Sequence, residues 1–142
     1  LLRADLGISG FGLEINAGYW PRGSAHRPAF EYGKLVDQWS QLGLPLMMFL
    51  TAADSDAEDP KAARNINAEL IKPSGVATQN SQAAWAASVA PLLLARTSVQ
   101  VLLWNQLADN EPHEFPHGGL FDANGKAKPT LKLLRDLRKA VD

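Results

Sequence analysis

The stretch Val99-Gln100-Val101-Leu102-Leu103-Trp104-Asn105 decides how this sequence is interpreted. Its apolar and β-branched residues are typical of a strand that is buried in a parallel sheet. The strand ends in an indole and an amide, and in an α/β barrel the carboxyl ends of the strands are where active sites are built. Because an aromatic face beside amides and carboxylates suits sugar hydroxyls and sugar rings, this stretch points to carbohydrate chemistry.

The order of a strand followed by a helix occurs three times along the chain. Apolar runs predict strands over residues 11–16, 45–51 and 99–104. Apolar residues at steps of three and four predict helices over residues 28–42, 81–95 and 128–141. A shorter helix is predicted over residues 61–70. Trp39 and Trp85 lie on these apolar stripes and are expected in the core, and Pro91 predicts a kink or an early end of its helix.

Strands that alternate with helices predict parallel strands joined by right-handed crossovers. A closed barrel needs about 250 residues, whereas a three-stranded sheet alone would leave two unpaired edges. An open doubly wound domain is the alternative, but long polar and aromatic loops follow the strands, as in barrels. We therefore predict an α/β fold in which residues 1–142 form the last three βα units of a (β/α)8 barrel, with neighbouring strands in sequence order and all helices on one face.

Composition excludes several classes of function. The chain of 142 residues has 14 Lys and Arg against 15 Asp and Glu, so it has no basic excess for binding nucleic acid. No apolar run reaches the ~18 residues that a membrane span requires. The absence of cysteine excludes disulfides and thiolate metal sites. No cofactor is predicted.

The beginning of the chain has neither an initiator Met nor a signal-peptide pattern. We expect the chain to be a piece of a longer, secreted or periplasmic protein whose preceding sequence supplies the rest of the barrel. The expected partner is a polysaccharide or an oligosaccharide.

Several short motifs occur in a characteristic order. They are Gly12-Leu13-Glu14-Ile15-Asn16, Leu42-Gly43-Leu44-Pro45-Leu46 with Thr51 and Asp54, and Trp104 and Asp109 followed by Gly119-Leu120-Phe121-Asp122, Gly125 and Lys128-Pro129. In this order the chain resembles the C-terminal portion of a glycoside hydrolase family 10 domain, the xylanase-type (β/α)8 barrel. The resemblance covers nearly all of the chain, is carried mainly by the last group of motifs, and implies strands six, seven and eight.

The sequence departs from this family where the chemistry takes place. Retaining glycosidases need two carboxyl groups about 5 Å apart. The resemblance places the acid/base on strand four, which the chain does not contain, and the nucleophile at position 52, which is Ala52. It also implies a glutamine at Glu14 and a histidine at Asn16. We therefore expect the chain alone to hydrolyse nothing, and the whole protein either to have moved its carboxylate or to be inactive.

Glu14 is the candidate for a relocated catalytic carboxylate. Alternation along the strand places Glu14 and Asn16 on the side toward the barrel axis. The alternative is a carboxylate that fixes a loop through Arg22 or Arg27. Asp54 matches an aspartate that supports the strand-six histidine in the family, but it is equally explained as a loop or helix-capping residue.

Six side chains are candidates for binding sugar. Trp104 would stack on a sugar ring or plug the core, whereas Asn105 and Asp109 would bind hydroxyls or lie in a solvated loop. Tyr19 and Trp20 follow a strand in a loop with Pro and Gly and are candidates for an exposed aromatic subsite. Asn16 completes the set. Glu14, Asn16, Asp54, Trp104 and Asn105 each lie near the end of a predicted strand or follow it. We therefore expect these five residues to cluster at the carboxyl edge of the sheet.

The segment His113-Glu114-Phe115-Pro116-His117 matches the H-E-x-x-H pattern of zinc peptidases. Such a site needs both histidines on one turn of a helix. Pro116 is incompatible with that turn, so no metal site is predicted and the histidines are assigned to the loop after the last strand.

Three functions from different classes are consistent with the sequence. The first is part of an O-glycosyl hydrolase that acts on a β-linked polysaccharide such as xylan. The second is a noncatalytic sugar-binding barrel, favoured by Ala52. The third is a small α/β domain with an unrelated ligand. A Trp-x-x-x-Asn-Glu strand in the preceding sequence would support the first, and its loss the second.

Overall fold

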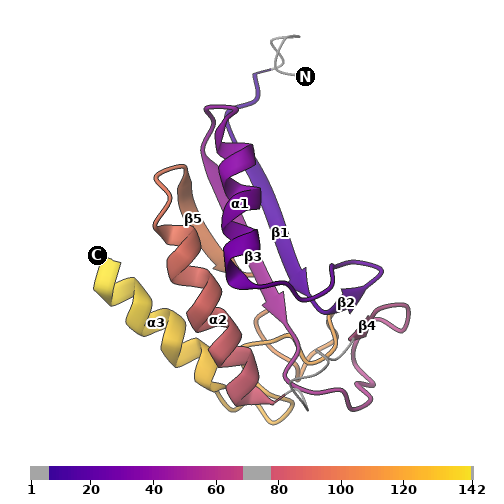
Figure 1. The fold of residues 1–142 in the computed structure, drawn as a ribbon. Helices are drawn as coiled ribbons and strands as arrows, with labels where there is room; N and C mark the ends of the chain where they lie inside the picture. The colour runs from indigo at the N-terminus through magenta and orange to yellow at the C-terminus, as the bar shows by residue number, and fades with distance from the viewer. Residues whose placement is uncertain (1–6, 69–77, 142) are drawn as a thin grey trace.

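Three parallel strands form the central sheet of the computed structural model, which describes residues 7–68 and 78–141 (Figure 1). They are β1 (Phe11–Ala17), β3 (Leu46–Ala52) and β5 (Val99–Trp104). The strands lie in the order β1-β3-β5, and both pairs are parallel. The predicted strands and their arrangement in sequence order are therefore confirmed.

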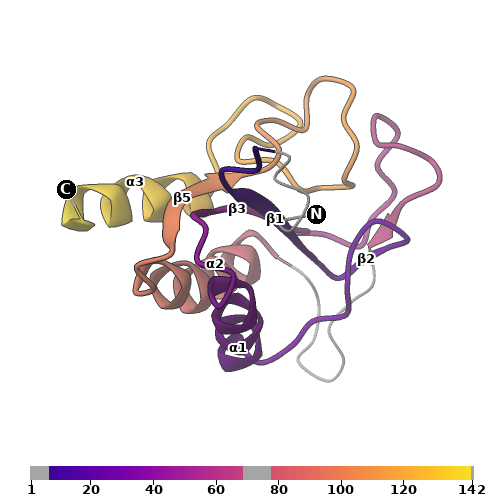
Figure 2. The same cartoon turned by 90° about the horizontal axis from the view of Figure 1, so that it is seen from above.

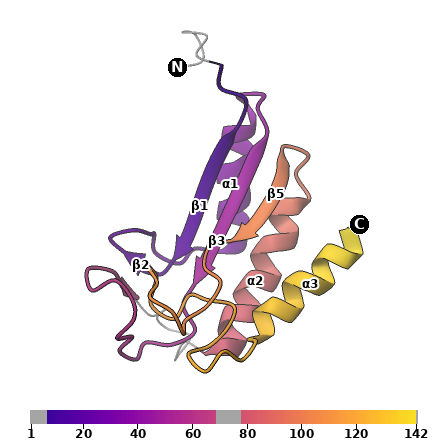
Figure 3. The same cartoon turned by 180° about the vertical axis from the view of Figure 1, so that it is seen from behind.

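The helices lie on one side of the sheet. They are α1 (Ala29–Ser40), α2 (Gln79–Leu94) and α3 (Pro129–Val141). In Figures 1 and 2, α1 and α2 cover one face, and α3 lies beside α2 at the end of the sheet that carries β5. Figure 3 shows the opposite face, which no helix of the described residues covers. This arrangement of strands and helices is that of an arc of a barrel.

The hydrophobic core lies between the sheet and its helices. Leu46, Met48 and Leu50 alternate along β3 and are fully buried toward the helices, where Val36 and Leu93 pack against them. The expected core positions of both tryptophans are confirmed, because Trp39 and Trp85 pack against this cluster. Trp39 also contacts Phe11, with ring centroids 5.3 Å apart.

One predicted helix is wrong. The part of the predicted helix 61–70 that the structure describes contains no helix; instead it holds an isolated bridge from Ala62 to His113 and the short strand β4 (Asn67–Ala68). Ile66 is buried there against Tyr19, so a tertiary contact outweighs the weak local pattern. Residues 69 and 70 lie outside the described residues.

Of the two outcomes predicted for Pro91, a kink or an early end of the helix, the early end is wrong, since α2 continues to Leu94. Proline removes one backbone hydrogen bond. The buried side chains of Val89, Ala90 and Leu93 hold this end of the helix on the sheet.

A second, two-stranded sheet was not expected from the sequence. The strand β2 (Tyr19–Trp20) pairs antiparallel with β4. Two-residue strands are too short to produce a period in the sequence.

No helix of the described part of the chain has the length and apolarity needed to cross a membrane.

Candidate functional site

Glu14 and Asn16 of β1 form a hydrogen-bonded group with Asn105, which directly follows β5, and we call this group the open-face cluster. The Asn16 side-chain amide donates to Glu14 Oε2 at 3.0 Å, and the Asn105 amide donates to Asn16 Oδ1 at 3.3 Å. Asn16 is buried, whereas Glu14 is exposed. Because Ile15 packs in the core toward the helices, its neighbours Glu14 and Asn16 belong to the face that the helices leave uncovered. The structure thus brings together three of the predicted site residues.

The loop after β1 holds Asn16 in place. Its amide also donates to the Arg22 carbonyl at 3.1 Å, and its own carbonyl accepts from the Ser24 amide at 3.1 Å. Gly18, with a φ of 81°, turns the chain back and donates to the Ser24 carbonyl at 2.7 Å. The alternative for Glu14 was an ion pair with Arg22 or Arg27, and Arg22 pairs with Glu114 instead.

Gly23 is required for this loop to close. A Cβ atom at this position would lie 2.2 Å from the Asn16 carbonyl oxygen and 2.8 Å from the Tyr19 carbonyl oxygen, so the backbone would have to move. We expect Gly23→Ala to lower the free energy of unfolding by about 1–3 kcal/mol, the usual cost of overpacking. Chemical denaturation measures this change, and the NMR signal of the Asn16 side-chain amide reports the displacement.

Gly12→Ala is the matched control for that substitution. Its nearest neighbour would be the Phe49 side chain at 3.2 Å, which is free to adjust. Equal losses of stability in the two variants would contradict the steric role of Gly23.

A second polar group, the buried ion triad, consists of Lys128, Asp54 and Asp109. The Lys128 Nζ lies 2.8 Å from Asp54 Oδ2 and 2.6 Å from Asp109 Oδ2. All three residues are buried, with Lys128 only 2% exposed. The other oxygen of Asp109 accepts from the Gly119 amide at 2.8 Å and from Gln106 Nε2 at 3.3 Å.

The buried ion triad corrects the prediction for Asp109. Asp109 is 4% exposed, and its two carboxylate oxygens accept hydrogen bonds from the Gly119 amide and the Lys128 ammonium. The carboxylate is therefore not available to sugar hydroxyls. For Asp54 the structure likewise shows a carboxylate that is paired with Lys128, and its predicted supporting role in catalysis remains untested. The Lys128-Pro129 motif at the start of the last helix was visible in the sequence. The sequence did not indicate which carboxylates pair with this lysine.

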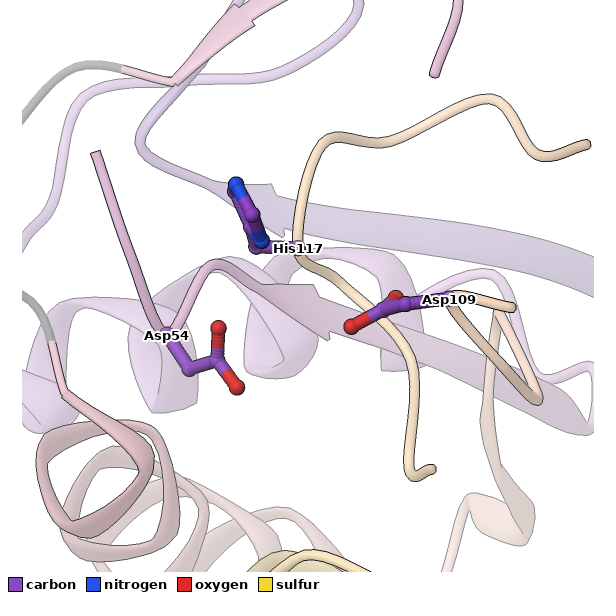
Figure 4. Close-up of side chains that lie close together, drawn as sticks. All are labelled: Asp54, Asp109 and His117. Atoms are coloured by element: carbon purple, nitrogen blue, oxygen red, sulfur yellow. The ribbon is translucent and has the colours of Figure 1, made fainter. Parts of the chain in front are cut away.

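Figure 4 shows Asp54 and Asp109 with His117, whose side chains offer oxygen and nitrogen atoms within 4.8 Å of one another. Such a set could hold a cation. Here the Lys128 ammonium contacts both carboxylates and supplies the positive charge that a metal ion would bring. We therefore assign this group a structural role.

The two aromatic residues after β1 have different environments. Tyr19 is 1% exposed, packs on Phe115 with ring centroids 5.0 Å apart and donates to the Pro116 carbonyl at 2.7 Å. Burial raises the pKa of the Tyr19 phenol well above its ordinary value, and the charges of Asp109, Asp54 and Asp59 raise it further. The prediction of Tyr19 as an exposed subsite is therefore wrong, because the ring belongs to a small core.

Trp20 is 63% exposed and remains a candidate for an aromatic contact with sugar. It alternates with Tyr19 along β2, and consecutive side chains of a strand point to opposite faces. This alternation places the indole of Trp20 on the side away from the small core.

Trp104 faces the helices. Its ring lies edge-on to Trp85, with centroids 6.2 Å apart, and its indole N–H donates to the Gly118 carbonyl at 2.7 Å. The cause is an irregularity in β5: Leu46 pairs with Val99 but Met47 pairs with Val101, so Gln100 is skipped. The residues that follow are thereby shifted to the opposite face. The structure favours the alternative in which Trp104 closes the core, and Trp104 does not join the open-face cluster as expected.

A pocket of about 620 Å³ lies beside the loop after β3. Its wall includes the charged residues Asp56, Glu58 and Arg64, together with Asn67 of β4. None of the predicted site residues lines this pocket among the described residues. Sequence periodicity gave no indication of it, because it is formed by loop segments.

The sequence matches no protein-family model and no curated protein. Its structure is similar to solved structures of enzymes that act on glycosides. The β-glucuronidase of Faecalibacterium prausnitzii matches with a TM-score of 0.66 and 13% identity, over 96% of this chain and 22% of that chain. The xylanase 10B of Thermotoga petrophila, solved with xylobiose, matches with a TM-score of 0.64 and 15% identity, over 99% and 39%.

An endo-1,4-β-xylanase of Caldicellulosiruptor owensensis matches with a TM-score of 0.55 and 19% identity, over 94% of this chain and 40% of that chain. This chain therefore spans less than half the length of the enzymes whose structures it matches. At these identities the likeness is one of fold. The α/β arrangement of three parallel strands and three helices in the described residues is thus that of part of a TIM barrel.

Proposed function

We propose that this chain forms the sugar-binding edge of an O-glycosyl hydrolase barrel that acts on a β-linked polysaccharide of the xylan type. The remaining strands would come from the sequence that precedes it, as in a divergent member of the xylanase-type family 10. The observation that carries the proposal is the exposed Glu14 carboxylate in the middle of β1, which accepts a hydrogen bond from Asn16 near the carboxyl end of that strand.

The chemistry of the open-face cluster supports this assignment. A carboxylate accepts hydrogen bonds from sugar hydroxyls, and asparagine side chains both donate and accept them. The Asn16 amide is held by the Arg22 carbonyl, so the Glu14 carboxylate is fixed before a ligand arrives. Barrel enzymes place their reacting groups at this end of the strands.

A hydrolase needs a second carboxyl group. The side chain of Ala52, at the end of β3, cannot attack an anomeric carbon. We therefore assign the role of nucleophile or base to Glu14 and that of the acid to a strand outside this chain. A separation of about 5 Å between the two would give retention of configuration, and about 6.5–9.5 Å would give inversion.

A noncatalytic sugar-binding barrel is the second candidate, and Ala52 is the observation that favours it. In that case the open-face cluster would bind the sugar without cleaving it. The third possibility, an unrelated small α/β domain, is not favoured by the likeness to the β-glucuronidase and xylanase structures named above.

Titration of the 142-residue chain with xylotriose tests the proposed site. We expect the side-chain amide signals of Asn16 and Asn105 to shift in the NMR spectrum, and no sugar to be hydrolysed, because a single carboxyl group does not suffice. Glu14→Gln should weaken binding by about tenfold, as expected for the loss of a charged hydrogen-bond acceptor.

Glu58→Gln is the matched control for that titration, because Glu58 is an exposed carboxylate in the pocket beside the loop after β3. A loss of binding in this variant, but not in Glu14→Gln, would move the sugar site to the pocket. Hydrolysis by the chain alone would overturn the assignment of the acid to another strand.

A further inference from the structure

We propose that residues 113–117 form a proton-controlled strap over the carboxyl edge of the sheet. The strap is closed when His113 carries a proton on both ring nitrogens and Asp59 is ionised. It ties together the loops that follow β1, β3 and β5. This inference does not depend on the proposed function, because it concerns how the loops are held and not what they bind.

The contacts of the His113 ring define its protonation state. Its Nδ1 lies 2.7 Å from the Glu111 carbonyl oxygen, and its Nε2 lies 2.7 Å from Asp59 Oδ2. A carbonyl and a carboxylate only accept hydrogen bonds, so both ring nitrogens must donate. A neutral imidazole has one N–H, whereas the imidazolium has two. The side chains of His113 and Asp59 are only 4% and 6% exposed, so the charged ring and the carboxylate neutralise each other out of water.

Asp59 is held from the other end of the strap as well. The backbone amide of His117 donates to Asp59 Oδ2 at 2.9 Å, and the His117 ring Nε2 lies 2.8 Å from the Ala57 carbonyl oxygen. A single carboxylate in the loop after β3 therefore receives hydrogen bonds from both ends of the segment 113–117.

The strap also contacts the loop after β1. The Pro116 carbonyl accepts from the Tyr19 hydroxyl at 2.7 Å, and Glu114 forms an ion pair with Arg22 at 2.5 Å. The backbone amide of His113 donates to the Lys61 carbonyl at 3.0 Å. The segment therefore contacts two loops whose residues lie far away in the sequence.

The backbone conformation of His117 is a second indication that surrounding contacts determine the shape of the strap. His117 has a φ of 51°, which is a left-handed backbone conformation that residues other than glycine rarely adopt. Such a residue persists only where surrounding contacts determine its conformation. Release of the Asp59 contacts would allow it to relax.

Three charged residues near the pair have partners of their own. Lys61 donates to the Asn110 carbonyl, Arg22 pairs with Glu114, and Lys128 pairs with Asp54 and Asp109. The backbone amides of Lys61 and His117 donate to Asp59, and Asp56, Glu58 and Arg64 line the same pocket as Asp59. The His117 ring nitrogen nearest to Asp59 is 3.9 Å away, too far for a hydrogen bond.

The closed strap requires the ionised form of Asp59 and a donor at both ring nitrogens of His113. Burial by itself would raise the pKa of Asp59, but the hydrogen bonds from His117, His113 and Lys61 outweigh it and lower the pKa below its ordinary value. The stability that Asp59 contributes is therefore present above the pKa of an unfolded aspartate and is lost as the pH falls through the lower folded value. A His113 ring with a single N–H can form only one of its two hydrogen bonds.

Nitrogen NMR of the 142-residue chain tests the protonation state directly. At about pH 6.5 we expect both ring nitrogens of His113 to show the imidazolium signature. His26, whose pKa burial lowers, should be neutral at the same pH and serves as the internal control. A neutral His113 ring at that pH would overturn the proposal.

Hydrogen exchange tests whether the strap opens. We expect the protection factor of the His117 amide, corrected for the intrinsic exchange rate, to fall at least about tenfold between about pH 6 and pH 9. In His113→Gln, which cannot donate at both positions, the protection should be low throughout this range. His26→Gln is the matched control and should behave as the parent chain. Parent-like protection of His117 in His113→Gln would contradict the strap, whereas Asp59→Asn should reproduce the low protection.

Discussion

Replacing Lys128 by methionine should lower the free energy of unfolding by about 3–5 kcal/mol, the cost of removing one partner from a buried ion pair. The expected loss is large because Lys128 neutralises two carboxylates, Asp54 and Asp109, which are 8% and 4% exposed. Methionine has a similar length and fills the same space without the charge. Denaturation of both proteins in guanidinium chloride measures the difference.

Lys126→Met is the control, because Lys126 is an exposed lysine two residues away. It should change the free energy of unfolding by less than about 0.5 kcal/mol, as exposed substitutions usually do. In the double variant Lys128→Met and Asp109→Asn, one of the two uncompensated charges is gone, and part of the lost stability should return. A stability of Lys128→Met equal to that of the parent would show that the triad does not hold the loops.

Glu14→Gln should reduce turnover by several orders of magnitude in the polypeptide that joins this chain to the rest of its barrel. Glutamine keeps the size of the side chain and can still accept the hydrogen bond that Asn16 now donates at 3.0 Å, but it cannot act as a nucleophile or base. Enzymes accelerate their reactions by about 10⁶-fold or more, so loss of one essential carboxylate has a large effect. Assays on xylan and on aryl glycosides measure the change.

Glu58→Gln is again the matched control, and its turnover should equal that of the parent, since Glu58 lines a separate pocket. Undiminished turnover in Glu14→Gln would place the chemistry elsewhere. A parent protein that binds xylan without any turnover would instead support the noncatalytic sugar-binding barrel.

The strands and helices were predictable because local sequence periodicity encodes them. The apolar run before Thr51 predicts a strand that is covered on both faces. In the structure Leu46, Met48 and Leu50 are buried toward the helices, whereas Met47 on the other face is exposed. The alternation in β1 likewise placed Ile15 toward the helices and Glu14 on the opposite face. Two of the expected site residues, Asn16 and Asn105, could be placed beside each other because parallel strands bring their carboxyl ends together.

The orientation of Trp104 was not predictable from the sequence. Simple alternation along β5 gives the wrong face for this residue, because Gln100 is skipped in the pairing with β3. A shift of one residue reverses the facing of every later side chain. Whether such an irregularity forms depends on the packing of the strand against its neighbour, which no local pattern records.

The sequence by itself determined the class of the fold, the order of its strands and the position of Glu14, because each follows from a period of two or of 3.6 residues. The tertiary structure alone decided which polar side chains are buried and paired with other groups of the protein. Lys128 meets Asp54, and His113 meets Asp59, across 54 or more residues of chain. Such contacts depend on how the loops fold over the edge of the sheet, where the chain has no repeating pattern, and they convert Asp109 from an expected sugar ligand into a partner of a buried lysine.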